Sequence, residues 1–112
     1  MPHYACIIQE GQTAQQRQEV LAGGLRRIGQ ESFGDDPTAC EISWIVVKRG
    51  FGWTAGEPST SSIVVRSVPV GLPLDRREAF MRKVCDLWER ETGCSIQEIV
   101  VTAWDGPLPL ER

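Results

Sequence analysis

The chain has 112 residues, of which 41% are hydrophobic, and this fits one globular domain that buries a core without metal or disulfide support. Its formal net charge of -3 excludes a broad basic surface, so nucleic acid is not expected as a partner. No cationic segment precedes a long apolar run, and no apolar run approaches the roughly 18 residues of a membrane span, so neither secretion nor membrane insertion is predicted.

The first half of the chain predicts a strand, a helix and a second strand. Residues 2–9 are strand-like, with Tyr4, Cys6 and Ile8 on one face and Ala5 and Ile7 on the other, so both faces are expected to be covered. Thr13 and Gln16 have the spacing of a capping box, and the helix predicted from there ends at Gly34, a residue typical of helix C-termini. The β-rich run 42–47 follows, and after it comes the loop KRGFGWTAGEPSTSS.

The apolar stripe of this helix carries one unusual feature, a pair of adjacent glycines. Gly23 and Gly24 lower helix stability, which indicates close packing of the helix against a sheet. The stripe itself, with helical spacing, consists of Val20, Leu21, Leu25 and Ile28.

The second half repeats this order. Residues 63–70 form a predicted strand, and Asp75 with Glu78 predicts the start of a helix that ends at Gly93. Residues 98–104 form the last predicted strand.

The two halves therefore indicate an internal duplication. Gly11 corresponds to Gly71, which gives a period of about 60 residues. We expect one domain over 1–112 with halves of about 2–60 and 61–112, in the α+β class, with the order βαβ-βαβ. Right-handed crossovers would place both helices on one face of a shared four-stranded sheet. The bare face would then need another subunit, so a homo-oligomer is expected.

The cysteines and the single histidine show no spacing typical of a zinc site, so no metal is expected. We expect a cytoplasmic protein whose four cysteines are reduced and mostly buried. They are Cys6, Cys40, Cys85 and Cys94.

The proline in the second position invites a chemical interpretation. Proline lacks an amide proton and is common at strand starts. Removal of Met1 would also leave Pro2 with a free secondary amine. An α-amino group titrates nearer neutrality than lysine, and apolar surroundings lower its pKa further. Such a group can act as a general base beside a carbonyl.

Several segments resemble the tautomerase superfamily, in particular its cis-3-chloroacrylic acid dehalogenase-like branch. They are the Met-Pro start, IIQEGQTAQQR, GFGWTAGEP and the βαβ-βαβ order, and together they cover essentially the whole chain. The chain is also similar to 4-oxalocrotonate tautomerase and malonate semialdehyde decarboxylase. The resemblance implies a tautomerase/MIF-like fold, a homotrimer, and Pro2 as general base or acid at the floor of a pocket, without a cofactor.

The chain departs from the family at its carboxylate-binding positions. Pro69 and Leu72 stand where the dehalogenase-like pattern has a pair of arginines, while Gln12 and Cys40 stand where smaller tautomerases have theirs. Haloacrylate dehalogenation and decarboxylation are therefore not expected. An α-keto or enol substrate that is aromatic or weakly charged fits better.

The expected substrate-binding residues include one that matches a family position, and the others are aromatic residues, Arg66 and Leu72. Phe51 matches the pocket phenylalanine of small tautomerases, although it and Trp53 could equally fill a subunit interface. Arg66 could replace the missing arginines or pair with an acidic residue. The full set is Tyr4, Phe51, Trp53, Arg66, Leu72 and Trp104.

Other polar residues have simpler interpretations. His3 is expected to be a strand or interface side chain, Asp105 a turn residue, and the pair Arg76 and Arg77 a solvated helix face.

Three functions remain open at this stage. The first is a cofactor-independent tautomerase that uses Pro2 on a small-molecule substrate. The second is a non-catalytic trimer that keeps the fold. The third is a ferredoxin-like regulatory module, because the order of elements alone fits that fold too.

Overall fold

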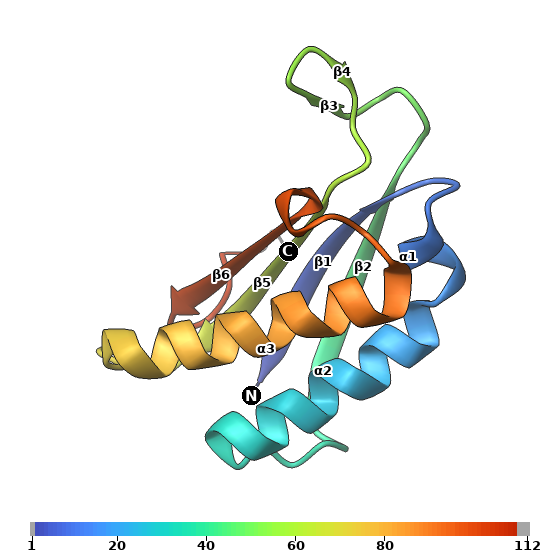
Figure 1. The fold of residues 1–112 in the computed structure, drawn as a ribbon. Helices are drawn as coiled ribbons and strands as arrows, with labels where there is room; N and C mark the ends of the chain where they lie inside the picture. The colour runs from blue at the N-terminus through green and yellow to red at the C-terminus, as the bar shows by residue number, and fades with distance from the viewer. Residues whose placement is uncertain (1, 110–112) are drawn as a thin grey trace.

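A computed structural model describes residues 2–109, and its main feature is a four-stranded mixed sheet (Figure 1). The strands lie in the order β2-β1-β5-β6. The outer pairs β1/β2 and β5/β6 are parallel, whereas the central pair β1/β5 is antiparallel. Their bounds are β1 His3–Gln9, β2 Glu41–Val47, β5 Ser62–Val68 and β6 Ile99–Asp105.

Two long helices cover one face of this sheet (Figure 1). The helical segments are α1 Thr13–Gln16, α2 Gln18–Phe33, α3 Leu74–Thr92 and the 3-10 turn η1 Ile96–Glu98. A small hairpin, β3 Trp53–Thr54 and β4 Glu57–Pro58, projects beyond one end of the sheet. This hairpin lies in the segment that the sequence predicted only as a loop.

The structure confirms the predicted fold class and the repeated unit. Each half is strand, helix and parallel strand, and the turn glycines Gly11 and Gly71 have φ of 85° and 82°. Gly34 and Gly93 end the two long helices in the left-handed conformation, as expected. The strands of each parallel pair are direct neighbours, so the arrangement differs from the split βαβ unit of a ferredoxin-like module.

The core fills the space between the sheet and the helices. Because side chains alternate along a strand, Tyr4, Cys6 and Ile8 of β1 face the helices together, and all three are fully buried. The largest buried side chains that meet them come from α2, β5 and α3 and are Leu21, Leu25, Val64, Phe80, Val84 and Trp88.

The start of the first helix differs from its prediction. Thr13 is already helical, Gln12 is the N-cap, and no side chain caps it. The helix is also interrupted at Arg17, whose φ of -113° and ψ of 26° lie outside helical values. This kink turns Val20 outward, so Val20 is 44% exposed and does not belong to the core.

The capping box predicted at Asp75 is also absent. Helix α3 begins at Leu74 after the N-cap Pro73, and no side chain caps its first turn. The carboxylate of Asp75 accepts a hydrogen bond from the amide of Arg76. A true capping box is formed instead by Ser95 and Glu98 at η1.

The two adjacent glycines have different surroundings. A Cβ on Gly24 would lie 2.5 Å from a methyl group of Leu87 in α3, so Gly24 permits close packing of two helices rather than of helix and sheet. Gly23 has nothing within 4 Å of that position, and the expectation of close packing is wrong there.

Candidate functional site

Pro2 lies at the sheet end opposite the hairpin. Its carbonyl accepts a hydrogen bond of 3.0 Å from the amide of Glu41, which joins the start of β1 to the start of β2. Tyr4 pairs with Arg66 of β5, so Pro2 lies near the C-terminal end of β5. Pro2 is half-buried in the single chain, and Met1 lies outside the described residues.

His3 forms a small polar cluster beside Pro2 on the sheet face away from the helices. Its Nε2 is 2.8 Å from the hydroxyl of Ser43 in β2. Its backbone amide donates to the hydroxyl of Ser67 in β5 over 3.1 Å. His3 is thus tied to both neighbouring strands, which fits its expected role in the strand.

The ends of β5 and β6 contribute the next group of residues. Ser67 pairs with Trp104, so the indole lies two strands away from the start of β1. Trp104 is 42% exposed, and its indole nitrogen donates to the carbonyl of Pro107 over 3.1 Å. Leu72, in the turn after β5, is buried.

Arg77 is more than a solvated charge on the first turn of α3. Its Nε donates to the carbonyl of Leu72 over 2.8 Å and its Nη1 to the carbonyl of Ala103 over 3.0 Å. Its remaining nitrogen pairs with the carboxylate of Asp105. The expectation of a freely solvated side chain is wrong for Arg77, because three acceptors fix it across the ends of α3 and β6.

Tyr4 and Arg66 lie on the helix side of the sheet and not in a pocket. Tyr4 is fully buried, and its hydroxyl donates to the carbonyl of Leu25 over 2.8 Å. Arg66 is 3% exposed, and its guanidinium lies 2.8 Å from the carboxylate of Asp35. Of the two roles left open for Arg66, the structure therefore shows the ion pair. This burial corrects the expectation that Tyr4 and Arg66 contact a ligand.

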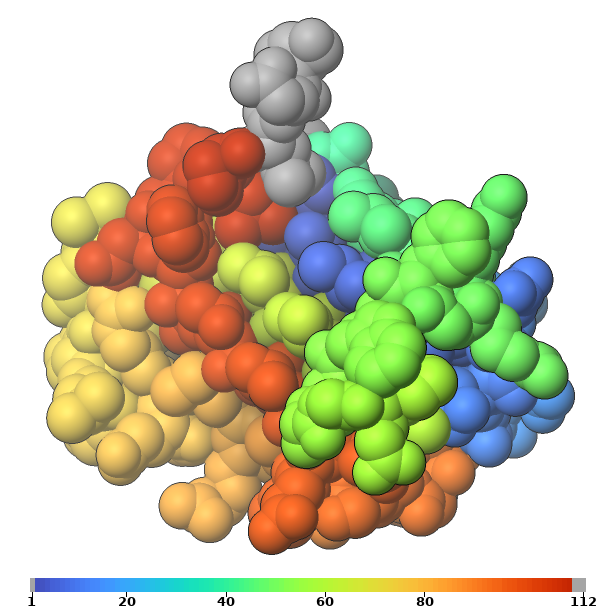
Figure 2. Space-filling model, turned by 90° about the horizontal axis from the view of Figure 1, so that it is seen from above, coloured from blue at the N-terminus to red at the C-terminus, as the bar shows by residue number. Residues whose placement is uncertain are grey.

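Phe51 and Trp53 lie at the opposite end of the sheet from Pro2, on the approach to the hairpin. Strands β1 and β2 run in parallel from Pro2 toward them for seven paired residues, a length of about 20 Å. Phe51 is 77% and Trp53 64% exposed. The ammonium group of Lys48 lies 6.0 Å from the centroid of the Phe51 ring. Figure 2 looks down on this end and shows the green hairpin segment standing at the surface.

The expected site residues thus form two groups that one chain does not bring together. Pro2, Leu72 and Trp104 belong to one end of the sheet, and Phe51 and Trp53 to the other. A pocket that contains both groups would need the hairpin end of a second chain.

The bare sheet face connects the two groups. It carries apolar side chains from all four strands, of which Ile45, Val100 and Trp104 are 50%, 51% and 42% exposed. Exposed apolar side chains gathered on one sheet face are typical of a subunit contact. The remaining apolar members are Ala5, Ile7, Val47, Ile63 and Val65.

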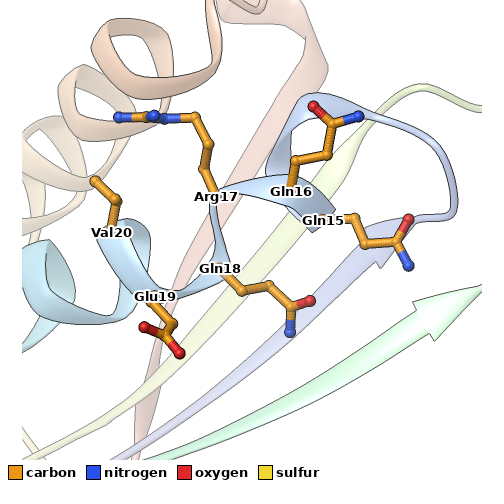
Figure 3. Close-up of a pocket in the computed structure, with 6 residues that line it drawn as sticks. All are labelled: Gln15, Gln16, Arg17, Gln18, Glu19 and Val20. Atoms are coloured by element: carbon orange, nitrogen blue, oxygen red, sulfur yellow. The ribbon is translucent and has the colours of Figure 1, made fainter.

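A shallow pocket occurs at the kink between α1 and α2, and none of the expected site residues line it (Figure 3). Its lining consists of the consecutive residues 15–20, whose side chains point in different directions. Arg17 turns toward α3 and pairs with Glu91 at 2.5 Å. Since these groups do not converge on one point, the pocket has no arrangement suited to catalysis.

Burial disfavours the ionisation of one phenol and two thiols of the core. It raises the pKa of Cys6 to about 12, and it also raises the pKa of Tyr4 and Cys40. Within residues 2–109, no three His, Cys, Asp or Glu side chains are grouped as metal ligands, and no helix has the length and apolar character to cross a bilayer.

The comparisons with known proteins rest on structure. No family model and no curated protein matches the sequence. Native Ps01740 superimposes with a TM-score of 0.85 at 24% identity, over 94% of each chain. Pt0534 inactivated by 2-oxo-3-pentynoate gives 0.82 at 19% identity, over 94% of this chain and 85% of that one. N1, a member of the cis-3-chloroacrylic acid dehalogenase family, gives 0.82 at 12% identity, over 94% and 75%.

Other similar structures broaden this group. They include fused 4-OT trimers and a macrophage migration inhibitory factor-like protein from Entamoeba histolytica, with TM-scores of 0.81 and 0.73 for the examples compared. These neighbours are tautomerase superfamily members, and the chain has their fold. The fold resemblance expected from the sequence is therefore confirmed.

Proposed function

We propose that this protein is a cofactor-independent, tautomerase-like enzyme in which Pro2, freed by removal of Met1, is the general base or acid. The observation that carries the proposal is the place of Pro2, at the start of a central strand in a fold shared with tautomerases and dehalogenases. A free α-amino group has a pKa of about 8, so about a tenth of it is unprotonated at pH 7, and apolar surroundings would raise this fraction. Pro2 would take a proton from the carbon beside a carbonyl and deliver it to the oxygen of the resulting enolate, and in ketonisation the same transfer would run in reverse.

The charges at the Pro2 end favour a substrate with little charge. Arg66 is buried in its ion pair with Asp35, and Arg77 is fixed by two carbonyls and Asp105. Neither guanidinium is free to form the bidentate contact that holds a carboxylate. Trp104 supplies exposed apolar surface instead, so we propose an aromatic or weakly charged α-keto or enol compound.

We further propose that the active form is a homotrimer. The bare sheet face is apolar, and Phe51 and Trp53 are strongly exposed in the single chain. A neighbouring chain would cover this face and bring Phe51 and Trp53 to Pro2, where Lys48 could add a cation. Several structural neighbours are described as trimers. The four described cysteines are all free thiols, which fits the cytoplasm.

The test begins with the intact mass of untagged protein, which shows whether Met1 is removed. The processed protein is then assayed for ketonisation of an aryl-substituted enol, followed by ultraviolet absorbance. Pro2→Ala replaces the secondary amine of the free proline with a primary amine. We expect this change to lower kcat at least 10-fold. Full activity in Pro2→Ala would refute a role for Pro2.

The alternative is a non-catalytic trimer of the same fold. The engagement of both Arg66 and Arg77 favours it, because a pocket without a free arginine binds small acids weakly. Retention of Met1 in protein from its native host, together with no turnover of enols, would support this alternative.

A further inference from the structure

Arg66 is a charged group in the core of the domain, and its bonds are almost all internal. Two guanidinium nitrogens contact the carboxylate of Asp35, at 2.8 and 3.1 Å. Its Nε donates to the carbonyl of Ser67 over 2.7 Å, and Nη1 lies 3.5 Å from the hydroxyl of Tyr4. A buried guanidinium carries a large desolvation cost, and these ion-pair and hydrogen-bond contacts offset part of it.

The surroundings of this ion pair fit it closely. The guanidinium carbon lies 4.5 Å from the ring centroid of Phe33, 5.2 Å from that of Tyr4 and 5.9 Å from that of Phe80, distances typical of cation-π contacts. Gly29 of α2 lies against the pair, and a Cβ there would overlap Asp35 and come within 2.9 Å of Arg66.

Both partners of the pair lead directly to Pro2. Ser67, whose carbonyl binds Arg66, also holds the backbone amide of His3 through its hydroxyl. Asp35 begins the segment between α2 and β2, and the first residue of β2, Glu41, donates its amide to the carbonyl of Pro2. The carbonyl of Pro2 and the amide of His3 belong to the same peptide group. Each is thus held by a segment that contacts the Arg66–Asp35 pair, one through Ser67 and the other through the chain from Asp35 to Glu41.

We propose that the Arg66–Asp35 ion pair is a positioning device for Pro2: it holds the end of β5 and the start of β2 in place and so fixes the direction of the Pro2 amine. Arg66 acts from inside the core and contacts no substrate. The proposal rests on the proposed function for its catalytic consequence, but the positioning itself is measurable without any activity.

The first measurement is amide hydrogen exchange by NMR. In Arg66→Met, whose side chain fits an apolar cage, we expect the amides of His3 and Glu41 to exchange at least 10-fold faster. The control is Leu87→Ala, a buried site on α3 that lowers stability without touching the pair. Asp35→Asn tests the same pair from the other side and serves if Arg66→Met does not fold.

The second measurement is the rate at which 3-pentyn-2-one, an uncharged alkynyl ketone that does not depend on a free arginine for binding, modifies Pro2. The free amine adds to the alkyne carbon farther from the ketone, and its proton passes to the alkyne carbon next to the ketone, so the N-terminal peptide gains the whole reagent mass. We expect a maximal rate at least 10-fold lower in Arg66→Met, with half-saturation unchanged. Leu87→Ala should remain within twofold of the wild type, and Arg66→Lys should restore part of the rate.

The outcomes separate the two proposals. If His3 and Glu41 keep their protection in both Arg66→Met and Asp35→Asn, or if Arg66→Met reacts as fast as wild type, the positioning role is refuted. If the processed wild-type protein gives no adduct on its N-terminal peptide, the reactivity proposed for Pro2 fails, and the exchange data alone decide on positioning.

Discussion

Three glycines in α2 provide a sharp test of the packing described above. Gly23, Gly24 and Gly29 share one helix but differ in their surroundings. A methyl group added to Gly23 would meet nothing, one on Gly24 would meet the methyl groups of Leu87, and one on Gly29 would meet the buried ion pair. Alanine in a helix is about 1 kcal/mol more favourable than glycine, and this gain is common to all three substitutions.

The expected free energies of unfolding differ because of what the added methyl group displaces. Gly23→Ala should raise the free energy of unfolding by about 0.5–1 kcal/mol. In Gly24→Ala, the cost of overpacking against Leu87, about 1–3 kcal/mol, should leave a net loss of up to about 2 kcal/mol. Gly29→Ala must separate a buried ion pair, which costs about 3–5 kcal/mol, so the net loss should be about 2–4 kcal/mol.

Urea unfolding monitored by tryptophan fluorescence measures these differences, at one fixed protein concentration because association adds to stability. The decisive comparison is Gly29→Ala against Gly23→Ala. Equal unfolding midpoints for these two variants would show that the Arg66–Asp35 pair does not occupy the space next to Gly29, and would refute the reasoning.

Two further predictions concern ionisation in the core. Tyr4 is the sole tyrosine of the chain, and burial raises its pKa. The folded protein at pH 11 should therefore show no phenolate absorbance at 295 nm, whereas the tyrosine of the denatured chain should be half-ionised near pH 10. Ionisation of Tyr4 near pH 10 in the folded protein would contradict its burial. Burial also raises the pKa of Cys6 from 9.0 to about 12, so its thiol stabilises the fold below pH 9.0, and this contribution is lost as the pH rises toward 12. Cys6→Ala should therefore lose less stability than wild type between pH 9.0 and 11 in urea unfolding; parallel declines of the two proteins would argue against a buried neutral thiol.

The elements that the sequence predicts well are those governed by local rules. The alternation in residues 2–9 and the glycines at positions 34 and 93 correctly predict a strand and two helix ends. The duplication then predicts the sheet, since two equal units with right-handed crossovers share one arrangement. The capping box of Ser95 and Glu98 also has the usual sequence spacing of such a cap, but it begins the short turn η1 just after the end of α3 and not a long helix.

The partners of Arg66 and Arg77 could not be predicted in the same way. Asp35 is 31 positions from Arg66, and the acceptors of Arg77 include two backbone carbonyls, which carry no signal in the sequence. An arginine in a strand is compatible with a binding site or an ion pair, and only the choice of sheet face decides between them. Arg66 has the same parity as Tyr4 in the pairing of β5 with β1, and this parity places both toward the helices.

The parallel pairing of β1 and β2 explains why one chain contains only part of the proposed site. β1 begins at the Pro2 end and β2 ends at the other, and because the two strands are parallel, the segment after β2 must start at the far end of the sheet. Phe51 follows β2 by four residues, too few to return along a strand of seven. Phe51 therefore cannot reach Pro2 of its own chain, and any catalysis that uses both residues requires a second chain.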